Sequence, residues 1–294
     1  MQTLYLIANI SRQGHFKEVL HEKTIAEKSI FYVGLMYKIR EFHPGMGLRK
    51  MYEQFQPEGI GRDAWINLGL QEGFRMAPSI NYYKTTYAIK SNKYENLLIK
   101  KEFTDVNQLW VSDIFYFPLN EKNYYAVLIM DVYSRKIVGG SIADNMRAEN
   151  NTKALSMALK LRGISNYNNN LIHHSDRGSQ YMSDVYTEML EEYQIRISVC
   201  FDVLENAHCE RANGTIKNEY LNRWSIKDED ELFYRFKEAT ENYNNRKHNS
   251  IKMTPNDYEI FLNEVPLDKR EKMEIFTIKS DTPNPFQLEL KFDL

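Results

Sequence analysis

The sequence has few cysteines, no excess of basic residues and no long hydrophobic segment, and each absence excludes a class of protein. Only two cysteines, Cys200 and Cys209, occur among 294 residues. This excludes a scaffold held by several disulfides, and we expect a reducing compartment such as the cytoplasm. The net charge of −2 argues against a simple cationic nucleic-acid binder. No apolar run approaches the roughly 20 residues of a membrane-spanning helix, and the N-terminus lacks the pattern of a signal peptide.

What the sequence does contain is apolar material for a sizeable core and an uneven distribution of charge. Hydrophobic residues make up 43% of the chain, which suits a folded globular protein of this length. Residues 1–101 hold 15 Lys and Arg against 9 Asp and Glu, whereas the rest holds 23 against 31. Such a distribution is typical of a nucleic-acid-binding segment joined to a domain that gathers carboxylates around a cation. Solvated surface charge gives the same composition, so the pattern alone decides nothing.

The first part of the chain predicts a small all-α module. An amphipathic run extends from residue 16 to about Glu41, and MGLRKMYEQFQ and GRDAWINLGLQEG follow after breaks that contain Pro and Gly. Short helices joined by such turns are typical of helix-turn-helix modules. We therefore expect a DNA-binding module over residues 1–77. Residues 78–104 show no sustained period and are expected to be a linker.

From residue 107 onward the pattern is that of an α/β domain. Three strand-like runs with short gaps predict antiparallel neighbours, with the apolar middle run at the centre of the sheet. Helices and strands then alternate. The expected elements are strands at 109–119, 122–134 and 136–144, a helix at 147–163, a strand at 170–176, a helix at 183–195, a strand at 196–200, and helices at 207–223 and 229–245. This order predicts a mixed five-stranded sheet with flanking helices over residues 105–262, followed by a partly extended tail over 263–294.

Three carboxylates are candidates for a cation site. Asp113 lies inside a predicted strand, where burial of a charge is costly, although neighbouring hydroxyls or a wet sheet edge would also explain it. Asp176 follows a strand at the carboxyl edge of the sheet, where open α/β sheets bind ligands, but Asp before Arg-Gly is also a common turn residue. Glu210 shares a helix face with Lys217, as an exposed helical Glu also would. Together, three such groups suit two Mg²⁺ ions.

Two other chemistries are less well supported by the sequence. A zinc site would draw on imidazole and thiol groups, but no CxxC or HxxxH pair is present. The groups considered for zinc are His173, His174, Cys200, His208 and Cys209. A serine nucleophile beside these histidines would require a G-x-S-x-G elbow, which the sequence lacks.

Five segments in this order carry a resemblance to a known family: NQLWVSDIFYF, YYAVLIMDVYSRKIVGGSIADNM, HHSDRGSQY, ENAHCERANGTIKNEY and YNNRKHNSIKMTP. They resemble the retroviral-integrase-like catalytic core of bacterial insertion-sequence transposases, in particular the second-frame (OrfB) product of the IS-three family. The segments HPGMGLRKMYEQF and GIGRDAWINLGLQEG are similar to the small helix-turn-helix module that precedes this core. The resemblance covers roughly residues 4–260.

The resemblance implies an RNase H-like fold with a DDE triad formed by Asp113, Asp176 and Glu210. In the family these residues bind two Mg²⁺ or Mn²⁺ ions, cut one strand at the element's end, and direct the freed 3′-hydroxyl to another phosphodiester. The expected partners are element-end and target DNA, further copies of the chain on DNA, and the product of an upstream (OrfA-type) frame, in the bacterial cytoplasm at the nucleoid. The expected DNA contacts are Lys217, Arg211, Arg177 and Asn213, with Arg49 and Lys50 in the helical module. We also expect His173 and His174 to orient Asp176 or to touch a DNA phosphate.

One departure from the family keeps an alternative open. Only 33 residues separate Asp176 from Glu210, two fewer than is typical of the family, and the loss falls in CFDVLENA. Because metal geometry tolerates little displacement, a misplaced Glu210 would leave a catalytically inactive relict or a DNA-binding regulator. A host ribonuclease of the same fold fits less well, since such enzymes usually carry an additional active-site carboxylate.

Overall fold

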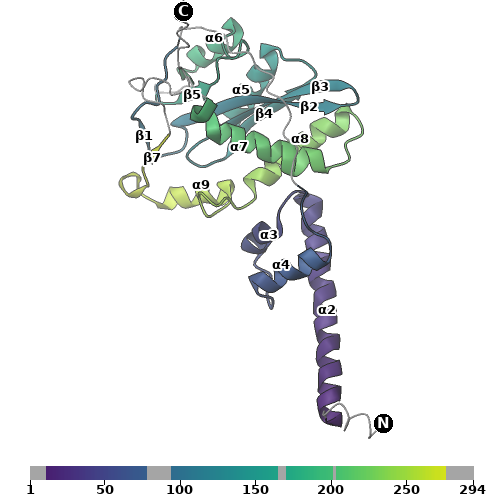
Figure 1. Ribbon diagram of the computed structural model, residues 1–294. Coiled ribbons are helices and arrows are strands. Elements are labelled where there is room, and N and C mark those ends of the chain that lie inside the picture. Colours follow the sequence, from purple (N-terminus) through teal and green to yellow (C-terminus); the bar gives the residue numbers. More distant parts are fainter. Residues whose placement is uncertain (1–10, 78–93, 165–169, 201–202, 276–294) are drawn as a thin grey trace, which may run out of the picture. The chain divides into compact units, whose positions relative to one another are not determined.

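The computed structural model describes residues 11–77, 94–164, 170–200 and 203–275, which belong to two compact units, residues 1–80 and 81–294 (Figure 1). The first unit is all-helical. Its helices are α2 (Arg12–Phe42), α3 (Leu48–Phe55) and α4 (Arg62–Gln71). They coincide with the three helical runs expected from the sequence.

The core of the first unit lies where the second half of α2 meets α3 and α4. The side chains of Met36, Met51 and Trp65 are fully buried there, and the indole Nε1 of Trp65 donates a hydrogen bond of 3.1 Å to the carbonyl of Leu48. A Cβ at Gly69 would lie 2.4 Å from the Leu48 side chain. Glycine therefore allows α4 to approach α3 closely.

The second unit is built on a mixed five-stranded sheet in the order β4-β3-β2-β5-β6. Strands β2, β3 and β4 are antiparallel neighbours, whereas β5 runs parallel to β2 and β6 parallel to β5. The strands are β2 (Leu109–Leu119), β3 (Lys122–Asp131), β4 (Ile137–Ala143), β5 (Ile172–Ser175) and β6 (Arg196–Val199). The expectation that the middle run of the first three lies at the centre was wrong. The crossover after β4 places β5 on the free side of β2, so β2 becomes the central strand.

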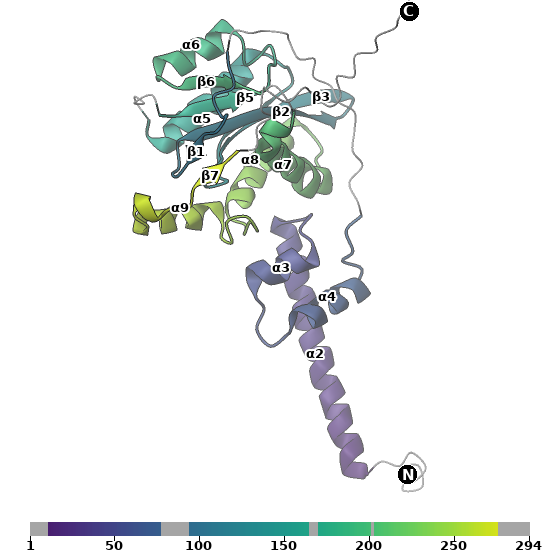
Figure 2. The same cartoon turned by 60° about the vertical axis from the view of Figure 1, so that its left-hand side comes forward.

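Helices cover both faces of this sheet (Figures 1 and 2). On one face, Val127 and Ile129 of β3 share a core with helices α5 and α6. On the other face, Leu128 and Met130 share a core with α7 and α8, as the alternation of side chains along a strand requires. The helices are α5 (Ala148–Arg162), α6 (Asp184–Glu192), α7 (Ala207–Thr215) and α8 (Glu229–Asn244).

The long helix expected at 207–223 changes its winding after α7. It continues as a π-helical turn, η2 (Ile216–Tyr220), and then as a 3₁₀ turn, η3 (Leu221–Arg223). A further 3₁₀ turn, η1 (Val203–Asn206), precedes α7. Widened π turns often occur at functional sites, and this one contains Lys217.

The compact unit extends on both sides of the expected 105–262 core. Leu98, Phe103 and Ile275 are buried in the same core as β2 and β3. Strand β1 (Glu102–Phe103) pairs antiparallel with β7 (Met273–Glu274). Segments on both flanks of the predicted core thus contribute to its packing, whereas residues 78–93 and 276–294 lie outside the described part.

A helix that the sequence pattern did not predict follows Met253, at the end of the expected 105–262 core. Helix α9 (Pro255–Glu264) begins at a Thr254 cap whose side chain accepts a hydrogen bond from the Asp257 amide, and Pro255 occupies its first position. Both features favour a helix start. A 3₁₀ turn, η4 (Leu267–Lys269), comes next. Among the described residues, no helix is both long and apolar enough to cross a membrane.

Candidate active site

Asp113 and Asp176 follow a pair of residues that lie opposite each other on neighbouring parallel strands. Strand β2 pairs with β5 so that Ser112 is opposite Ser175; Asp113 is the next residue of β2, and Asp176 directly follows the end of β5. The Asp113 side chain is half-buried, and its Oδ2 accepts a hydrogen bond of 2.9 Å from Asn213 of α7. The sheet register therefore brings two carboxylates from distant parts of the sequence to one edge.

Glu210 is placed at this edge by contacts at the start of α7. The Nδ2 atom of Asn206 donates to the carbonyl of Ser112 at 2.9 Å, which ties the start of α7 to β2 directly beside Asp113. One turn further on, Cys209 is fully buried against the sheet, while the neighbouring Glu210 is exposed. Its charge is near enough to Asp113 to raise the pKa of that group.

The charges of Asp176 and Glu210 both act on Asp113. Burial, together with the negative charges of Asp176 and Glu210, raises the pKa of Asp113 to about 7, although hydrogen bonds from Ile114 and Asn213 oppose the change. The pKa of Asp176 is also raised by burial, against a hydrogen bond from the Gly178 amide. Such shifts mark sites where carboxylates are held together without a compensating positive charge.

The donor chemistry suits a hard divalent cation, but the three groups are not gathered as a set. Within the described residues, no group of three or more His, Cys, Asp or Glu side chains is placed to hold a metal ion. Asp113 and Asp176 are half-buried, whereas Glu210 is exposed. Mutual repulsion of unneutralised carboxylates favours such a spread arrangement.

Gly178 fits closely against Asp176. Its amide donates a hydrogen bond of 3.0 Å to Asp176 Oδ1, and a Cβ at this position would lie 3.0 Å from the same oxygen and 3.1 Å from the side chain of Gln180. Any side chain here would push against the carboxylate. Glycine at position 178 thus allows the backbone to orient Asp176.

The two histidines before Asp176 are core residues, and the expectation that they orient its carboxylate or touch DNA was wrong. His173 is hydrogen-bonded through Nε2 to the Tyr186 hydroxyl at 2.9 Å, and His174 through Nδ1 to the Ser198 hydroxyl at 2.8 Å. Burial lowers the pKa of His173 to about 3 and that of His174 to about 4. Both rings are therefore neutral near pH 7, and they link β5 to α6 and β6.

The residues expected to contact DNA differ in their surroundings. Arg211 is exposed and Arg177 is half-buried beside Asp176. Lys217 is half-buried, with its Nζ 4.0 Å from the centre of the Tyr116 ring, a cation–π contact. Burial lowers the pKa of this lysine. Asn213 is turned inward instead: only 6% of it is exposed, and its amide donates to Asp113.

In the first unit, Arg49 and Lys50 both lie on α3 and are exposed. Arg49 forms an ion pair of 2.8 Å with Glu53, one turn further along the helix. An exposed pair of this kind is weak, so a phosphate can compete for the arginine.

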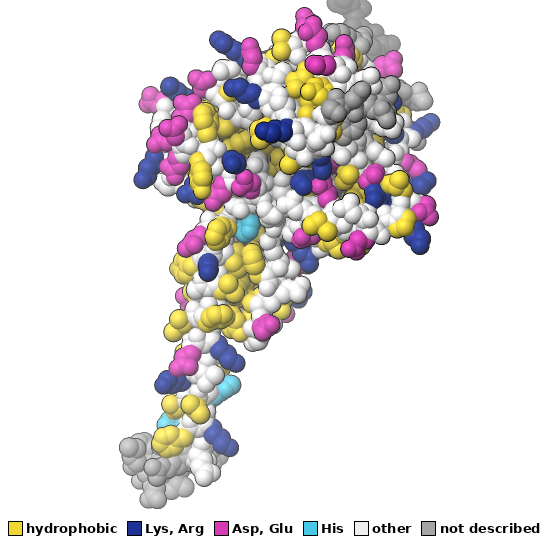
Figure 3. Space-filling model, turned by 180° about the vertical axis from the view of Figure 1, so that it is seen from behind, with side chains coloured by type: hydrophobic (Ala, Val, Ile, Leu, Met, Phe, Trp, Pro, Cys, Tyr) yellow, Lys and Arg dark blue, Asp and Glu magenta, His cyan; other side chains and the backbone are white. Residues whose placement is uncertain are grey.

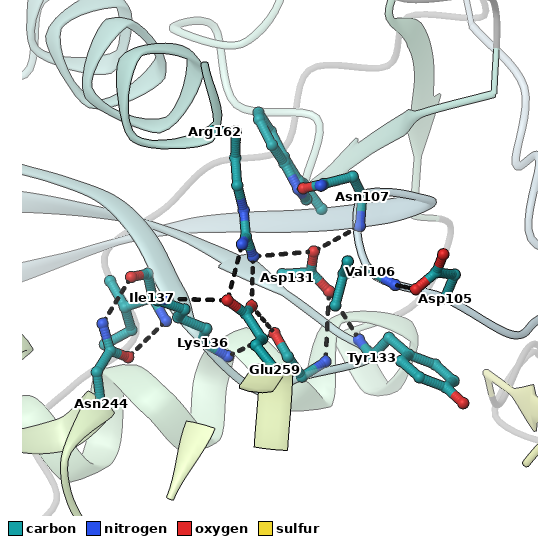
Figure 4. Close-up of polar contacts among 12 residues, drawn as sticks. Asp105, Val106, Asn107, Asp131, Tyr133, Lys136, Ile137, Arg162, Asn244 and Glu259 are labelled. Carbon is teal, nitrogen blue, oxygen red and sulfur yellow. Dashed lines mark hydrogen bonds and ion pairs between the residues drawn. The ribbon is translucent and has the colours of Figure 1, made fainter. Parts of the chain in front are cut away.

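A second cluster of charges, which the sequence did not reveal, lies at the far end of β3 (Figure 4). Fully buried Asp131 accepts hydrogen bonds from the backbone of Asn107 at 2.6 Å and from Arg162 at 3.3 Å. Glu259 of α9 binds both Arg162 nitrogens, at 2.6 and 2.9 Å, and Lys136 at 2.9 Å. We call Asp131, Lys136, Arg162 and Glu259 the α9 junction. The signal that was available is an Asp that ends a long apolar strand.

Comparisons with known proteins agree with this geometry. Residues 104–201 match the family model of the integrase core domain. The fold is similar to that in the cryo-EM structure of the simian T-cell lymphotropic virus intasome in complex with PP2A regulatory subunit B56 gamma. That match has a TM-score of 0.50 and 14% identity, and covers 84% of this chain and 76% of that chain. The fold is thus that of the RNase H-like integrases.

Two relatives from Shigella sonnei narrow the class. The chain is 30% identical over 252 residues to the insertion element IS600 uncharacterized 31 kDa protein, covering 82% of this chain and 90% of that protein. It is 31% identical over 214 residues to the transposase for insertion sequence element IS629, covering 70% of each. The chain belongs to the IS-three family of insertion-sequence transposases with a retroviral-integrase-like core.

Proposed function

We propose that this chain catalyses DNA strand cleavage and strand transfer at the ends of an insertion sequence, with Asp113, Asp176 and Glu210 as its catalytic carboxylates. One observation carries the proposal. The three charges come from strand β2, the residue after β5, and helix α7, and they are near enough that Asp176 and Glu210 raise the pKa of Asp113. Membership of a transposase family supports the same chemistry.

The carboxylate oxygens of these residues are the donors that Mg²⁺ and Mn²⁺ prefer, and we assign them two such ions. When bound at such a site, the cations activate the attacking oxygen of the phosphodiester reaction and stabilise the leaving oxygen. The chain's own contribution is orientation. Asn213 holds one oxygen of Asp113, and the Gly178 amide holds one oxygen of Asp176. With a pKa of about 7, Asp113 releases its proton near neutral pH and then offers two anionic oxygens.

The DNA is assigned to the same edge of the sheet. Arg177 follows Asp176, while Arg211 and Lys217 follow Glu210 on the same helical segment, so phosphates near the carboxylates would meet positive charge. We assign Arg49 and Lys50 of the first unit to contacts with the DNA backbone. The substrates in this proposal are element-end and target DNA, bound by more than one copy of the chain, and an upstream-frame product is a further candidate partner. The proposed setting is the bacterial nucleoid.

Asp176→Asn tests the proposal, because it keeps the shape of the side chain and removes its charge. We expect strand transfer on element-end DNA with Mg²⁺ to fall by at least about a thousandfold, as expected when cationic stabilisation of a reacting phosphate is lost. Asp184→Asn, an exposed aspartate eight residues further on, is the matched control and should retain activity. Equal activity in wild type and Asp176→Asn would contradict the proposed mechanism.

A second candidate function is that of an inactive relict or a DNA-binding regulator. It is favoured by the exposed position of Glu210 and by the lack, in the described residues, of three ligands placed for one metal ion. Calorimetric titration with Mn²⁺ separates the two functions. Binding that weakens at least about tenfold in both Asp176→Asn and Glu210→Gln supports the catalytic site. Titration curves that neither substitution changes would favour the regulator.

A further inference from the structure

The N-terminal part of α2 extends past the core of its unit. Residues 12–31 span about 30 Å at 1.5 Å per residue, and the buried side chains of the helix begin at Tyr32. Apolar side chains are nevertheless frequent in this segment, and Figure 3 shows them among charged ones. The large exposed ones are Phe16, Val19, Leu20, Ile25, Ile30 and Phe31. A helical segment of this length is marginal on its own in water, which points to a partner.

One stripe along this segment has the spacing of a coiled-coil seam. Its members follow one another at alternating intervals of four and three residues, which keeps them on one side of the helix. We call this set the α2 seam: Phe16, Leu20, Lys23, Glu27, Ile30 and Gly34, all exposed. Leu20 is 66% and Ile30 is 74% exposed. Ile25 lies on the opposite side and is not a member.

The residues of the α2 seam complement those of a second α2 seam that runs in the opposite direction. If a second α2 runs in the opposite direction, Leu20 meets the second copy's Ile30, and Lys23 meets the second copy's Glu27. The same two contacts recur on the other side of the two-fold axis. In a parallel pair in register, Lys23 would face Lys23 and Glu27 would face Glu27, which is unfavourable.

The ends of the seam fit this arrangement as well. Phe16 of one helix would lie against Gly34 of the other, and a Cβ built at Gly34 has nothing within 4 Å. That position therefore leaves room for an aromatic ring. A bulky apolar residue opposite a glycine, and a basic residue opposite an acidic one, together specify one register.

We propose that α2 pairs with α2 of a second copy of this chain as an antiparallel two-helix coiled coil, with the two Lys23–Glu27 ion pairs at its centre. The inference rests on the α2 seam alone. It does not depend on the carboxylates of the second unit, and it would hold for an active enzyme and for a regulator alike.

Charge reversal in the full chain tests the pairing. By sedimentation, we expect a concentration-dependent dimer whose dissociation constant rises at least about tenfold in Lys23→Glu and in Glu27→Lys, because each creates like-charged contacts. The double variant Lys23→Glu with Glu27→Lys should return to the wild-type constant. Ile25→Gln, on the opposite side, is the control and should change nothing.

Cysteine cross-linking tests the direction of the helices. Chains that carry Leu20→Cys, mixed with differently tagged chains that carry Ile30→Cys, should form a mixed disulfide dimer on oxidation, while Leu20→Cys alone should not. Dimers of Leu20→Cys with itself would overturn the antiparallel arrangement. A wild-type chain that stays monomeric at all concentrations, or a double charge variant as weak as the single ones, would overturn the proposal. Far-UV circular dichroism of each variant shows whether α2 is still helical.

Discussion

The two clusters of carboxylates in the second unit contrast in how their charge is balanced. In the α9 junction, Asp131 and Glu259 share Arg162, and Glu259 also binds Lys136. In the candidate active site, neither Asp113 nor Asp176 forms an ion pair with any residue that the structure describes. Their hydrogen-bond partners are an amide side chain and a backbone N–H.

The difference is visible in the pKa values of Glu259 and Asp113. Hydrogen bonds from Arg162, Ser134 and Lys136 lower the pKa of Glu259 in spite of its burial, while burial raises the pKa of Asp131 in the same junction to about 6 against the charge of Arg162. The pKa of Asp113 rises to about 7, because only the hydrogen bonds from Ile114 and Asn213, and no cation, oppose its burial. A carboxylate neutralised from within the chain holds the fold together. A carboxylate that is left unneutralised is suited to a positive charge from outside, which is what a catalytic cation site requires.

Among these predictions, the largest loss of stability is expected when Glu259 is removed from the α9 junction. In Glu259→Ala, Arg162 and Lys136 lose their main partner while they stay largely buried, so we expect the free energy of unfolding to fall by about 3 kcal/mol. Chemical denaturation measures this change. Glu264→Ala removes an exposed glutamate from the same helix and should cost less than about 0.5 kcal/mol. Equal effects of the two substitutions would show that the junction does not stabilise the fold.

Neutralisation of Asp113 should raise the free energy of unfolding, whereas removal of Glu259 lowers it. Between pH about 4 and about 7 the folded chain keeps a proton that the unfolded chain has released, so stability falls as pH rises through this range. In metal-free buffer at pH 8, Asp113→Asn should therefore gain about 1–2 kcal/mol, after allowance for the partial exposure of the group. Its stability should also vary less between pH 4 and 7.

Thermal unfolding with a chelator present provides the measurement for Asp113→Asn, and the exposed Asp144→Asn is the control. A loss of stability in Asp113→Asn at pH 8 would show that the charge of Asp113 is already compensated within the chain. The candidate site would then resemble the α9 junction, and the contrast between the two clusters would disappear.

The smallest effect is expected for Asn213, which donates to Asp113. Asn213→Ala removes a hydrogen bond that lowers the pKa of Asp113, so that pKa should rise further, and the free energy of unfolding should fall by about 1 kcal/mol. Carbon-detected NMR titration of the Asp113 carboxyl reports the first change. Asn222→Ala, an exposed asparagine further along the chain, should leave the titration as it is. An unchanged pKa in Asn213→Ala would remove Asn213 from its positioning role.

Local sequence patterns predicted most of the helices and strands, but not the order of the strands in the sheet. The run 109–119 coincides with β2, and the helical spacing at 147–163 coincides with α5. Both could be predicted because the spacing of apolar residues within one segment distinguishes a strand from a helix. The central position of β2 depends on the pairing with β5, some 60 residues away in the sequence. Since β2 and β3 are about equally apolar, their composition alone could not show which strand lies at the centre.

The sequence indicated which kinds of residue form the candidate site, but not how buried its neighbours are. Carboxylates in unusual places made Asp113 and Asp176 candidates, and the structure places each of them directly after one member of the Ser112–Ser175 pair. Burial could not be read in the same way: His173 and His174 looked like polar neighbours of the site, yet they are core residues. The start of α9 did leave a signal, since a Thr-Pro pair followed by an acidic residue is a helix start, but no helix was predicted there.

The shared register of β2 and β5 also bears on how the length of this chain can vary. Because the Ser112–Ser175 pairing sets the spacing of the two aspartates, insertions or deletions between β4 and β5 change the loops and leave that spacing intact. Glu210 has a comparable anchor in Asn206, which is bound to the carbonyl of Ser112. A deletion of two residues before Asn206 therefore need not move helix α7, which carries Glu210.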